Sequence, residues 1–392
     1  MRWSEIRSVE VEAAHPGESL IAGRSYVSLS SNDYLGLAND ERVLEAGVSA
    51  LSVFGAGSRA ARSFGGNTSL HRQLEDELAE FIGAEAALLF GSGYLCNVGT
   101  VTALVGVGDV VLSDRNNHAS IIDGARLSGA DIRVFEHMNI ADLRVSMEAD
   151  RQHGERLIAA DSVFSMDGTM GPVPDLTAVA RKEGAMLLLD DAHAVGAWGS
   201  TGRGSLEYFG ISGGFTAMVG TLGKALGSAG AYVVGDKRVI EHIAETARTF
   251  LFTTALSPCD VATALQSLLI LRSEPERIER LWFNATSLHA GLLDLGFDVP
   301  QQATPIIPVF LGDGDLTSDA ARYLRREGVL VGVATAPFVA PGRERLRIIA
   351  SAGHTPDHID RALHAFSRLH SASTRLRDAA STDGLLAGLT DE

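Results

Sequence analysis

The sequence is poor in cysteine and in long apolar runs. Cysteine occurs twice in 392 residues, at Cys96 and Cys259, which excludes a disulfide framework and predicts a reducing, cytoplasmic location. No stretch reaches the roughly 18–20 consecutive apolar residues that a membrane-spanning helix needs. Residues 1–12 contain charged side chains and no apolar run, so we expect no signal peptide. These absences exclude a disulfide-rich secreted protein and a helical membrane protein.

Positive charge is also scarce. The chain has 33 Lys and Arg residues against 49 Asp and Glu residues, a formal net charge of −16. Such an acidic surface argues against nucleic acid or an anionic membrane as a partner, and it requires a phosphate-bearing ligand to be held by a local site. The length suits a large domain with a smaller one, and the 45% hydrophobic content is ordinary for a globular protein.

Lys224 lies in a glycine-rich stretch, Gly-Thr-Leu-Gly-Lys-Ala-Leu-Gly, that covers residues 220–227. Small residues on both sides let a bulky planar group approach the backbone closely. A lysine in this setting serves as a Schiff-base nucleophile, as a phosphate-binding residue or as an ordinary surface residue. The P-loop form of phosphate binding is excluded, because Met218 stands in place of the first glycine and Ala225 in place of the hydroxyl.

An apolar run at 186–189 leads into two acids and a histidine, Asp190, Asp191 and His193. The pattern predicts a buried parallel strand that ends at the edge where α/β sheets bind ligands. An acid there can pair with a protonated ring nitrogen, and a histidine three residues later can reach a ring hydroxyl. With Lys224 they form the set that pyridoxal 5'-phosphate (PLP) enzymes use. Asp190 is preferred for its spacing from His193, and Asp191 is then a supporting or solvated carboxylate.

Seven short segments, in one order along the chain, resemble the α-oxoamine synthases, a family of fold-type I PLP enzymes. The resemblance extends from about residue 31 to about residue 355. The segments are 31–36, 92–94, 117–120, 164–168, 190–193, 221–224 and 345–347. Each segment alone is weak evidence, and their common order makes the match specific.

The resemblance implies an α/β fold, with a large domain built on a mostly parallel sheet and a small C-terminal α/β domain. We predict an N-terminal arm at 1–45, a large PLP-binding domain at 46–275, a small domain at 276–370 and a mobile tail at 371–392. The resemblance also implies a homodimer whose active site lies at the subunit interface, and no metal ion.

By resemblance, five side chains act on the cofactor ring. Lys224 forms the Schiff base, Asp190 keeps the pyridine nitrogen protonated, and His193 reaches the ring hydroxyl. Ser165 would bond near the same hydroxyl, and His118 would stack on the ring and donate a proton. The alternative for His118 is a histidine that only satisfies its own loop.

A glycine-rich turn at 91–94 precedes a predicted helix. Such a turn presents backbone N–H groups and the positive end of the helix dipole, which suits a phosphate. By resemblance, the amides of Gly93 and Tyr94 and the hydroxyl of Thr221 bind the cofactor phosphate. Thr254 would reach the phosphate in the neighbouring subunit.

Two residues are implied in binding the amino-acid substrate. Arg347 would hold its carboxylate in a bidentate fork, and Asn32 would lie near it. An Asx turn, in which the side chain caps its own backbone, is the alternative for Asn32. Arg345, two residues before Arg347 in a predicted strand, should face the other way.

Position 61 bears on the acyl donor. In the 5-aminolevulinate synthases, one branch of the family, a hydroxyl here helps to bind the succinyl carboxylate, whereas this chain has Ala61. Desolvating a carboxylate beside a methyl group is costly. We therefore expect a neutral acyl chain to be preferred over succinyl, unless Arg59 supplies a new partner for the charge.

The predicted reaction is the decarboxylative condensation of a small amino acid (alanine, glycine or serine) with an acyl thioester of CoA or of an acyl carrier protein. It yields an α-amino ketone, CO2 and a free thiol. Three alternatives stay open. The first is another PLP reaction on this fold, such as transamination or aldol cleavage. The second is a non-catalytic partner subunit, which Lys224 disfavours, and the third is a module that binds another phosphate ligand.

Overall fold

The computed structural model describes residues 10–149 and 154–382 and divides the chain into two compact units. One unit comprises residues 32–280. The other combines residues 10–31 with the described residues from 281 onward. In the described part of the chain, no helix has the length and apolar character needed to cross a membrane.

The unit of residues 32–280 is built on a seven-stranded sheet with the order β4-β10-β9-β8-β7-β5-β6. The strands are β4 (Ala86–Phe90), β5 (Val110–Asp114), β6 (Asp131–Phe135), β7 (Arg156–Asp161), β8 (Met186–Asp190), β9 (Ala217–Thr221) and β10 (Ala231–Gly235). From β9 to β6 all neighbours are parallel, and β10 is antiparallel to both β4 and β9. The predicted α/β fold with a mostly parallel sheet is confirmed.

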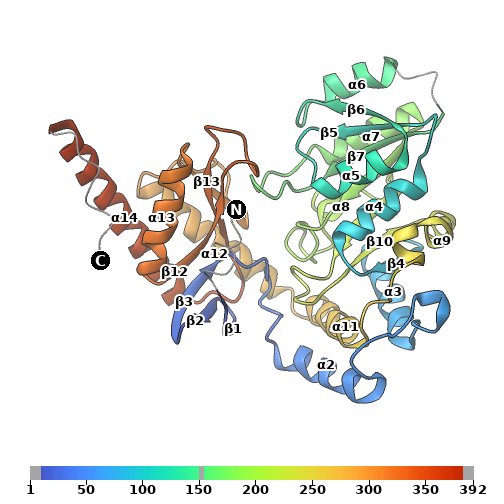
Figure 1. The fold of residues 1–392 in the computed structure, drawn as a ribbon, viewed down its shortest axis with the longest axis horizontal. Coiled ribbons are helices and arrows are strands. Elements are labelled where there is room, and N and C mark those ends of the chain that lie inside the picture. Colours follow the sequence, from blue (N-terminus) through green and yellow to red (C-terminus); the bar gives the residue numbers. More distant parts are fainter. Residues whose placement is uncertain (1–9, 150–153, 383–392) are drawn as a thin grey trace. The chain divides into compact units, whose positions relative to one another are not determined.

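Helices lie on both faces of this sheet (Figure 1). They are α2 (Glu41–Phe54), α3 (Ser69–Ile82), α4 (Gly93–Leu104), α5 (Ala119–Ser128), α6 (Ile140–Ala149), α7 (Val173–Glu183), α8 (Ser205–Tyr208), α9 (Lys237–Thr246), α10 (Arg248–Leu251) and α11 (Pro258–Ser273), with a 3₁₀ turn, η1, at Arg62–Phe64. Because both faces are covered, the central strands are largely apolar, and every residue of β5 and β10 is buried.

The parallel strands bring polar residues to one edge of the sheet. β5, β7 and β8 end at Asp114, Asp161 and Asp190, and all three carboxylates are buried. In parallel sheets the carboxyl ends of the strands share an edge, which is where ligands bind. The fold therefore gathers three acids and the loops that follow them at one place.

The other unit contains a six-stranded sheet with the order β1-β2-β3-β12-β13-β11. Its strands are β1 (Ala13–His15), β2 (Glu18–Ile21), β3 (Arg24–Leu29), β11 (Ile306–Phe310), β12 (Val329–Ala334) and β13 (Arg345–Ile349). Its helices are α13 (Gly314–Arg326), α14 (Pro356–Thr382) and α12 (Glu276–Asp294) from residue 281 onward. Only the β3–β12 pairing is parallel among the described strands of this sheet.

The N-terminal strands belong to this second sheet. Val27 and Leu29 of β3 are completely buried, and β3 pairs with β12 some 300 residues later, Val27 opposite Val329. Residues inside the predicted arm at 1–45 thus form part of the C-terminal unit's core. At the other end, α14 continues past residue 371, where we expected a mobile tail, and residues 383–392 lie outside the described part of the chain.

Candidate active site

Lys224 lies in a tight loop directly after β9. The loop is closed by a 2.8 Å hydrogen bond from the Gly227 amide to the Lys224 carbonyl. Thr221, the last residue of β9, accepts from the Gly223 amide at 3.2 Å and donates to the Gly230 carbonyl at 3.2 Å. These bonds fix the backbone on both sides of the half-buried lysine.

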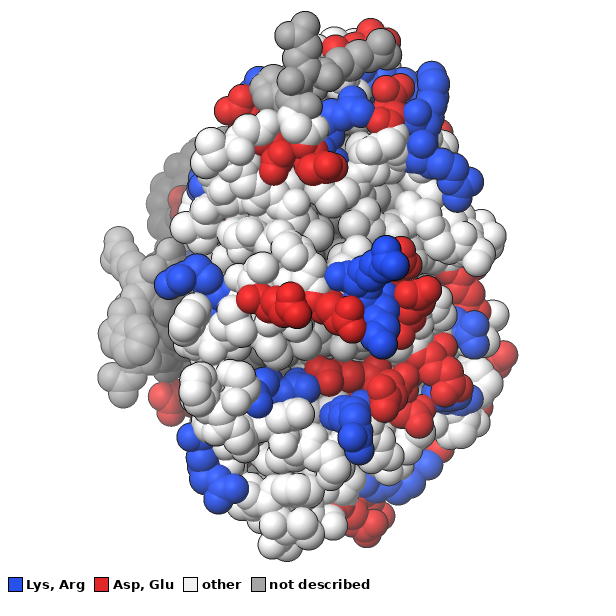
Figure 2. Space-filling view, turned by 90° about the vertical axis from the view of Figure 1, so that its right-hand side faces the viewer, with Lys and Arg blue, Asp and Glu red and all other residues white. Residues whose placement is uncertain are grey.

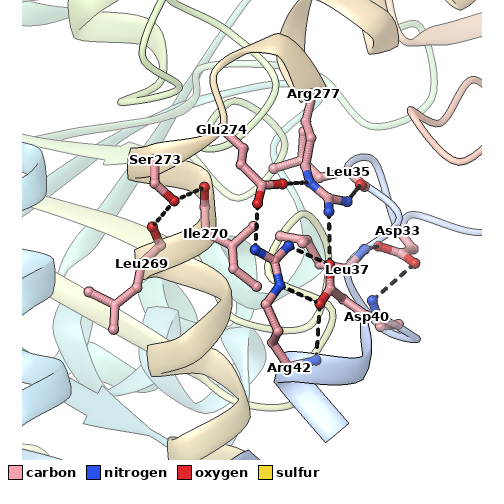
Figure 3. A network of polar contacts seen from close by, with 11 residues as sticks. Asp33, Leu35, Leu37, Asp40, Arg42, Leu269, Ile270, Ser273, Glu274 and Arg277 are labelled. Atoms are coloured by element: carbon pink, nitrogen blue, oxygen red, sulfur yellow. Dashed lines mark hydrogen bonds and ion pairs between the residues drawn. The ribbon is translucent and has the colours of Figure 1, made fainter.

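The turn at 31–36 lies against this loop. Gly227 has a φ of 58°, and a Cβ built on it would lie 2.5 Å from the Ala38 amide nitrogen, so only glycine fits there. Asp33 shapes the turn by accepting from the amides of Leu37 at 2.9 Å and Ala38 at 3.3 Å (Figure 3). Burial raises the pKa of the Asp33 carboxyl. Asn32 therefore sits in a turn packed beside the lysine loop.

Tyr34, in the same turn, is a site residue that we missed from the sequence. Its hydroxyl lies 2.7 Å from Nδ1 of His193, and both side chains are buried. The two rings meet edge to face with centroids 6.2 Å apart. This contact orients His193, three residues beyond the strand that carries Asp190. The sequence did offer one indication, because Tyr34 lies in the segment 31–36, which resembles the family.

Asp190 and Asp191 have different partners. Asp190 accepts from the Ala192 amide at 3.0 Å and from Nδ2 of Asn97 at 2.6 Å. Asp191 is fully buried and accepts from the amide of Ser205 at 3.0 Å and from its hydroxyl at 2.5 Å. Burial raises the pKa of Asp191. Asp191 thus anchors the start of α8, while Asp190 is held by α4.

His118 caps the N-terminus of α5. Its Nδ1 lies 2.7 Å from the Ser120 hydroxyl and accepts from the Ser120 amide at 3.3 Å. Its own amide donates to Asp161 at 2.7 Å. His118 as a whole is an exposed residue. The ring is therefore anchored through one nitrogen while Nε2 lies on the opposite side of the ring.

The carboxyl group of Asp161 interacts electrostatically with both Asp190 and Lys224. Burial, and then the neighbouring charge of Asp190, raise its pKa well above the usual value for a carboxyl. The His118 amide and the charge of Lys224 act in the opposite direction. These effects are only felt at short range, so Lys224, Asp161 and Asp190 share one electrostatic environment.

The N-terminus of α4 has the features that bind an anion. Ser92 caps the helix by accepting from the Leu95 amide at 3.2 Å. Helix geometry leaves the amides of Gly93 and Tyr94, in the first turn, without acceptors inside the helix. Around the position where a Cβ on Gly93 would lie, no described atom comes within 4 Å. A phosphate can approach these amides and the positive end of the helix dipole.

The residues fit PLP. The site offers a primary amine for its carbonyl group, a buried carboxylate for its ring nitrogen, an oriented histidine for its hydroxyl and a helix N-terminus for its phosphate. Ser165 lies in the turn after β7, which a 2.8 Å bond from the Gly168 amide to the Phe164 carbonyl closes. Within the described ranges, no group of three or more His, Cys, Asp or Glu side chains is placed to hold a metal ion.

Two predicted site residues make none of the contacts described above. Thr254 is exposed in the segment between α10 and α11. Arg347 lies on β13, in the unit that contains residues 10–31, opposite Gly332 of β12. Arg345 is buried with its guanidinium 4.8 Å from the centre of the Phe310 ring, so strand alternation turns Arg347 to the other face. The roles of Thr254 and Arg347 stay predictions.

The sequence of this chain is similar to a family model and to two named synthases. The family model for aminotransferase class I and II matches residues 24–366. The chain is 45% identical over 361 residues to the 8-amino-7-oxononanoate synthase of Symbiobacterium thermophilum, covering 92% of both chains. It is 40% identical over 360 residues to the synthase of the same name from Alkaliphilus oremlandii, covering 92% of this chain and 91% of the other.

Solved structures agree with these relatives. The chain superposes with a TM-score of 0.91 on serine palmitoyltransferase from S. paucimobilis with bound PLP–myriocin. The two chains are 33% identical, and the match covers 94% of each.

Proposed function

This chain belongs to the α-oxoamine synthases within the class I and II aminotransferase family, and from that premise we propose which substrates it joins. It has the fold-type I architecture, and its cofactor is pyridoxal 5'-phosphate. It is a PLP-dependent acyltransferase that condenses an amino acid with an acyl thioester and releases CO2. The finer choice of amino acid and acyl chain is our proposal.

The proposed substrates are alanine and a seven-carbon acyl thioester that ends in a carboxylate, which replaces the neutral acyl chain that we expected from Ala61. The relatives are named for 8-amino-7-oxononanoate, a nine-carbon acid with an amino group next to a ketone. A decarboxylative condensation forms the bond between these two carbons. The amino-bearing carbon and its methyl group then come from alanine, and the remaining seven carbons come from the acyl donor. We propose CoA or an acyl carrier protein as the thiol carrier.

The loop around Ala61 supports a donor other than succinyl. The neighbouring Arg62 is engaged with Glu75 through two bonds of 2.8 and 2.9 Å, and both side chains are nearly buried. Arg62 is therefore not available for a short acyl carboxylate. Arg59 is exposed and has a positive φ of 63°. It stays the alternative partner for such a charge.

We propose one role for each of four residues and for the cofactor. Bound PLP supplies an electron sink for the bonds broken at the α-carbon. Lys224 is proposed to remove the α-proton as general base, and Asp190 to hold the proton on the ring nitrogen. His118 is proposed to return a proton after CO2 leaves. Arg347 is proposed to bind the substrate carboxylate through its planar guanidinium.

We also propose a cytoplasmic homodimer, in which the exposed Thr254 reaches the cofactor phosphate of the other subunit. The charged surface does not suggest a polyanionic partner. Figure 2 shows one face of the molecule on which Lys and Arg side chains are interspersed with Asp and Glu. With a net charge of −16, the protein lacks the basic excess that drives binding to nucleic acid.

The observation that carries this proposal is the convergence of Lys224, Asp190 and His118 at one edge of a sheet in a chain with these relatives. A panel of alanine, glycine and serine against thioesters of several chain lengths tests it. We expect product masses for alanine with the seven-carbon donor, and at least about tenfold lower kcat/KM for succinyl-CoA, equal to about 1.4 kcal/mol. Succinyl-CoA as the best donor would make Arg59 the partner of its carboxylate. Amino transfer or aldol products without CO2 would overturn the proposal.

A further inference from the structure

We propose that Asn97 and Ser120 are positioning residues that hold His118 in the tautomer with its proton on Nε2. Three hydrogen bonds connect His118 to Asp190 through these two side chains. The proposal rests on the proposed function, because it concerns the proton that His118 returns to the product. It concerns the protonation pattern of the protein itself, so it is testable without turnover.

The chain of contacts is short and buried. Asn97 of α4 donates through Nδ2 to Asp190 at 2.6 Å and to the Ser120 hydroxyl at 2.9 Å. The Ser120 hydroxyl lies 2.7 Å from Nδ1 of His118. Asn97 is 1% exposed, Ser120 0% and Asp190 5%. With no bulk water to offer other partners, the direction of each bond is set by its neighbours.

The direction starts at Asp190. An ionised carboxylate only accepts hydrogen bonds, so the Asn97 amide must turn its NH2 group toward Asp190. The opposite orientation would place a carbonyl oxygen 2.6 Å from that carboxylate. The second hydrogen of the same NH2 group then points to the Ser120 hydroxyl, which becomes an acceptor. Since a hydroxyl carries one hydrogen, that hydrogen remains for His118.

Nδ1 of His118 is thus an acceptor. The Ser120 hydroxyl donates to it, and so does the Ser120 backbone amide at 3.3 Å, a group that can act only as a donor. A ring nitrogen that accepts carries no proton, so in the neutral ring the proton lies on Nε2. The exposed edge of the ring therefore presents an N–H, as a proton donor to the substrate requires.

The same chain links the two groups that control the reaction. Asp190 is proposed to keep the ring nitrogen of the cofactor protonated. The side-chain amide of Asn97 orients both Asp190 and, through Ser120, His118. A flipped His118 ring would turn Nδ1 away from Ser120 and lose both donors. A substitution of Asn97 should therefore change the tautomer ratio of His118, although Ser120 lies between the two residues.

Long-range proton–nitrogen correlation spectra of holoenzyme labelled in histidine test the proposal. His118 is assigned by the signal that His118→Asn removes. We expect an unprotonated Nδ1 and a protonated Nε2 at neutral pH in the wild type. Ser120→Ala should shift the tautomer ratio toward Nδ1–H by about fivefold, the effect of one lost hydrogen bond. Its kcat should fall while the PLP Kd and the fold are retained.

Asn97→Ala separates a connected chain from a local effect. Without the NH2 group of Asn97, the Ser120 hydroxyl is free to accept from a protonated Nδ1, so His118 should show the same shift although Ser120 is intact. Ser128→Ala is the control, because Ser128 lies on the same helix and its hydroxyl bonds to the Ala125 carbonyl at 2.7 Å. It should leave the His118 signals unchanged.

A protonated Nδ1 in the wild type, or identical tautomer ratios in wild type, Ser120→Ala and Asn97→Ala, would overturn the inference. This failure is distinct from failure of the proposed function. An enzyme that makes the ketone with His118 in the other tautomer would refute only the positioning role. The expected tautomer in a protein that releases no CO2 would refute only the function.

Discussion

At the scale of single residues, two acids that are adjacent in the sequence have different environments in the site. Asp190 and Asp191 are adjacent, yet one is bound by Asn97 and the other by Ser205. Sequence spacing pointed to Asp190, and the partners of Asp191 explain what the second acid does. Its two bonds fix the loop after β8 to the start of α8.

We predict that Asp190→Asn lowers kcat by at least about 100-fold, since it removes the charge that holds the ring nitrogen's proton. PLP affinity should fall only modestly, because the phosphate site is intact. Asp191→Asn should lower kcat by less than about tenfold and act mainly on thermal stability. Steady-state kinetics, a PLP titration and Tm distinguish the two. Equal loss of kcat at both positions would contradict the assignment of Asp190.

Histidine burial predicts a pH dependence of stability. Burial, and then the charge of Arg62, lower the pKa of His71 from 6.5 to about 4. In the unfolded chain the imidazole takes up a proton below about pH 6.5, whereas in the folded protein it stays neutral to about pH 4. Stability is therefore fully present above pH 6.5 and is lost as the pH falls through this window. His71→Gln should flatten the pH dependence of the unfolding free energy.

Urea unfolding at pH 7 and pH 5 measures this effect. The exposed His370 gives a control, since His370→Gln should leave the slope between the two pH values unchanged. An identical loss of stability in wild type and His71→Gln would show that other groups cause the acid sensitivity.

At the scale of elements, a cluster of charges anchors the turn that carries Tyr34. Arg277 donates to Asp40 at 2.8 Å, to Glu274 at 2.7 Å and to the Leu35 carbonyl at 3.2 Å (Figure 3). Arg42 also contacts both acids. The cluster connects the turn after residue 31 to the first turn of α12 and to Glu274 before it, and so supports the His193 contact indirectly.

We predict that Arg277→Ala destabilises the protein by about 1–3 kcal/mol, because it leaves partly buried acceptors without their donor. It should also weaken PLP binding severalfold through the loosened turn. Arg115→Ala is the matched control. Its ion pair with Glu136 is about half exposed on both sides, and such pairs contribute about 0–1 kcal/mol. Equal effects on urea unfolding and PLP affinity would refute an anchoring role for Arg277.

Local patterns predicted the elements that carry the chemistry. The apolar runs that end in Asp161 and Asp190 gave two parallel strands, and the glycine-rich turn before Gly93 gave the start of α4. Each of these signals lies within about ten residues. Strand period and helix capping act over that distance, so sequence alone is enough to locate them.

Long-range pairings were not predictable in this way. Tyr34 and His193 are 159 residues apart, and Asn97 and Asp190 are 93 apart. The pairing of β3 with β12 joins the two ends of the chain. Such contacts depend on the path of the whole chain, and nothing in the local pattern of residues 13–29 distinguishes a sheet strand in the C-terminal unit from an arm.

At the scale of the whole molecule, the proposed dimer predicts complementation between defective subunits. Lys224→Ala removes the proposed catalytic base, and Thr254→Ala removes a hydroxyl that we assign to the neighbour's phosphate site. In a mixed dimer, the subunit with an intact Lys224 would receive an intact Thr254 from its partner. One site of the two should then bind PLP with wild-type affinity.

Co-purified mixed dimers with two different affinity tags measure this. We expect a wild-type Kd for half of the sites, against a severalfold weaker Kd in the Thr254→Ala homodimer. A mixed dimer whose lysine-containing site keeps the weak Kd would place Thr254 in its own subunit's site. A monomer in sedimentation experiments would refute the dimer itself.

In this enzyme, loss of the amino acid's carboxyl group is coupled to acyl transfer, and isotope labelling measures the coupling. Alanine labelled in its carboxyl carbon is supplied together with the seven-carbon thioester. We predict that all label leaves as CO2, with one thiol released for each α-amino ketone, and that Lys224→Ala releases neither. Label retained in the product, or thiol released without CO2, would refute the coupling.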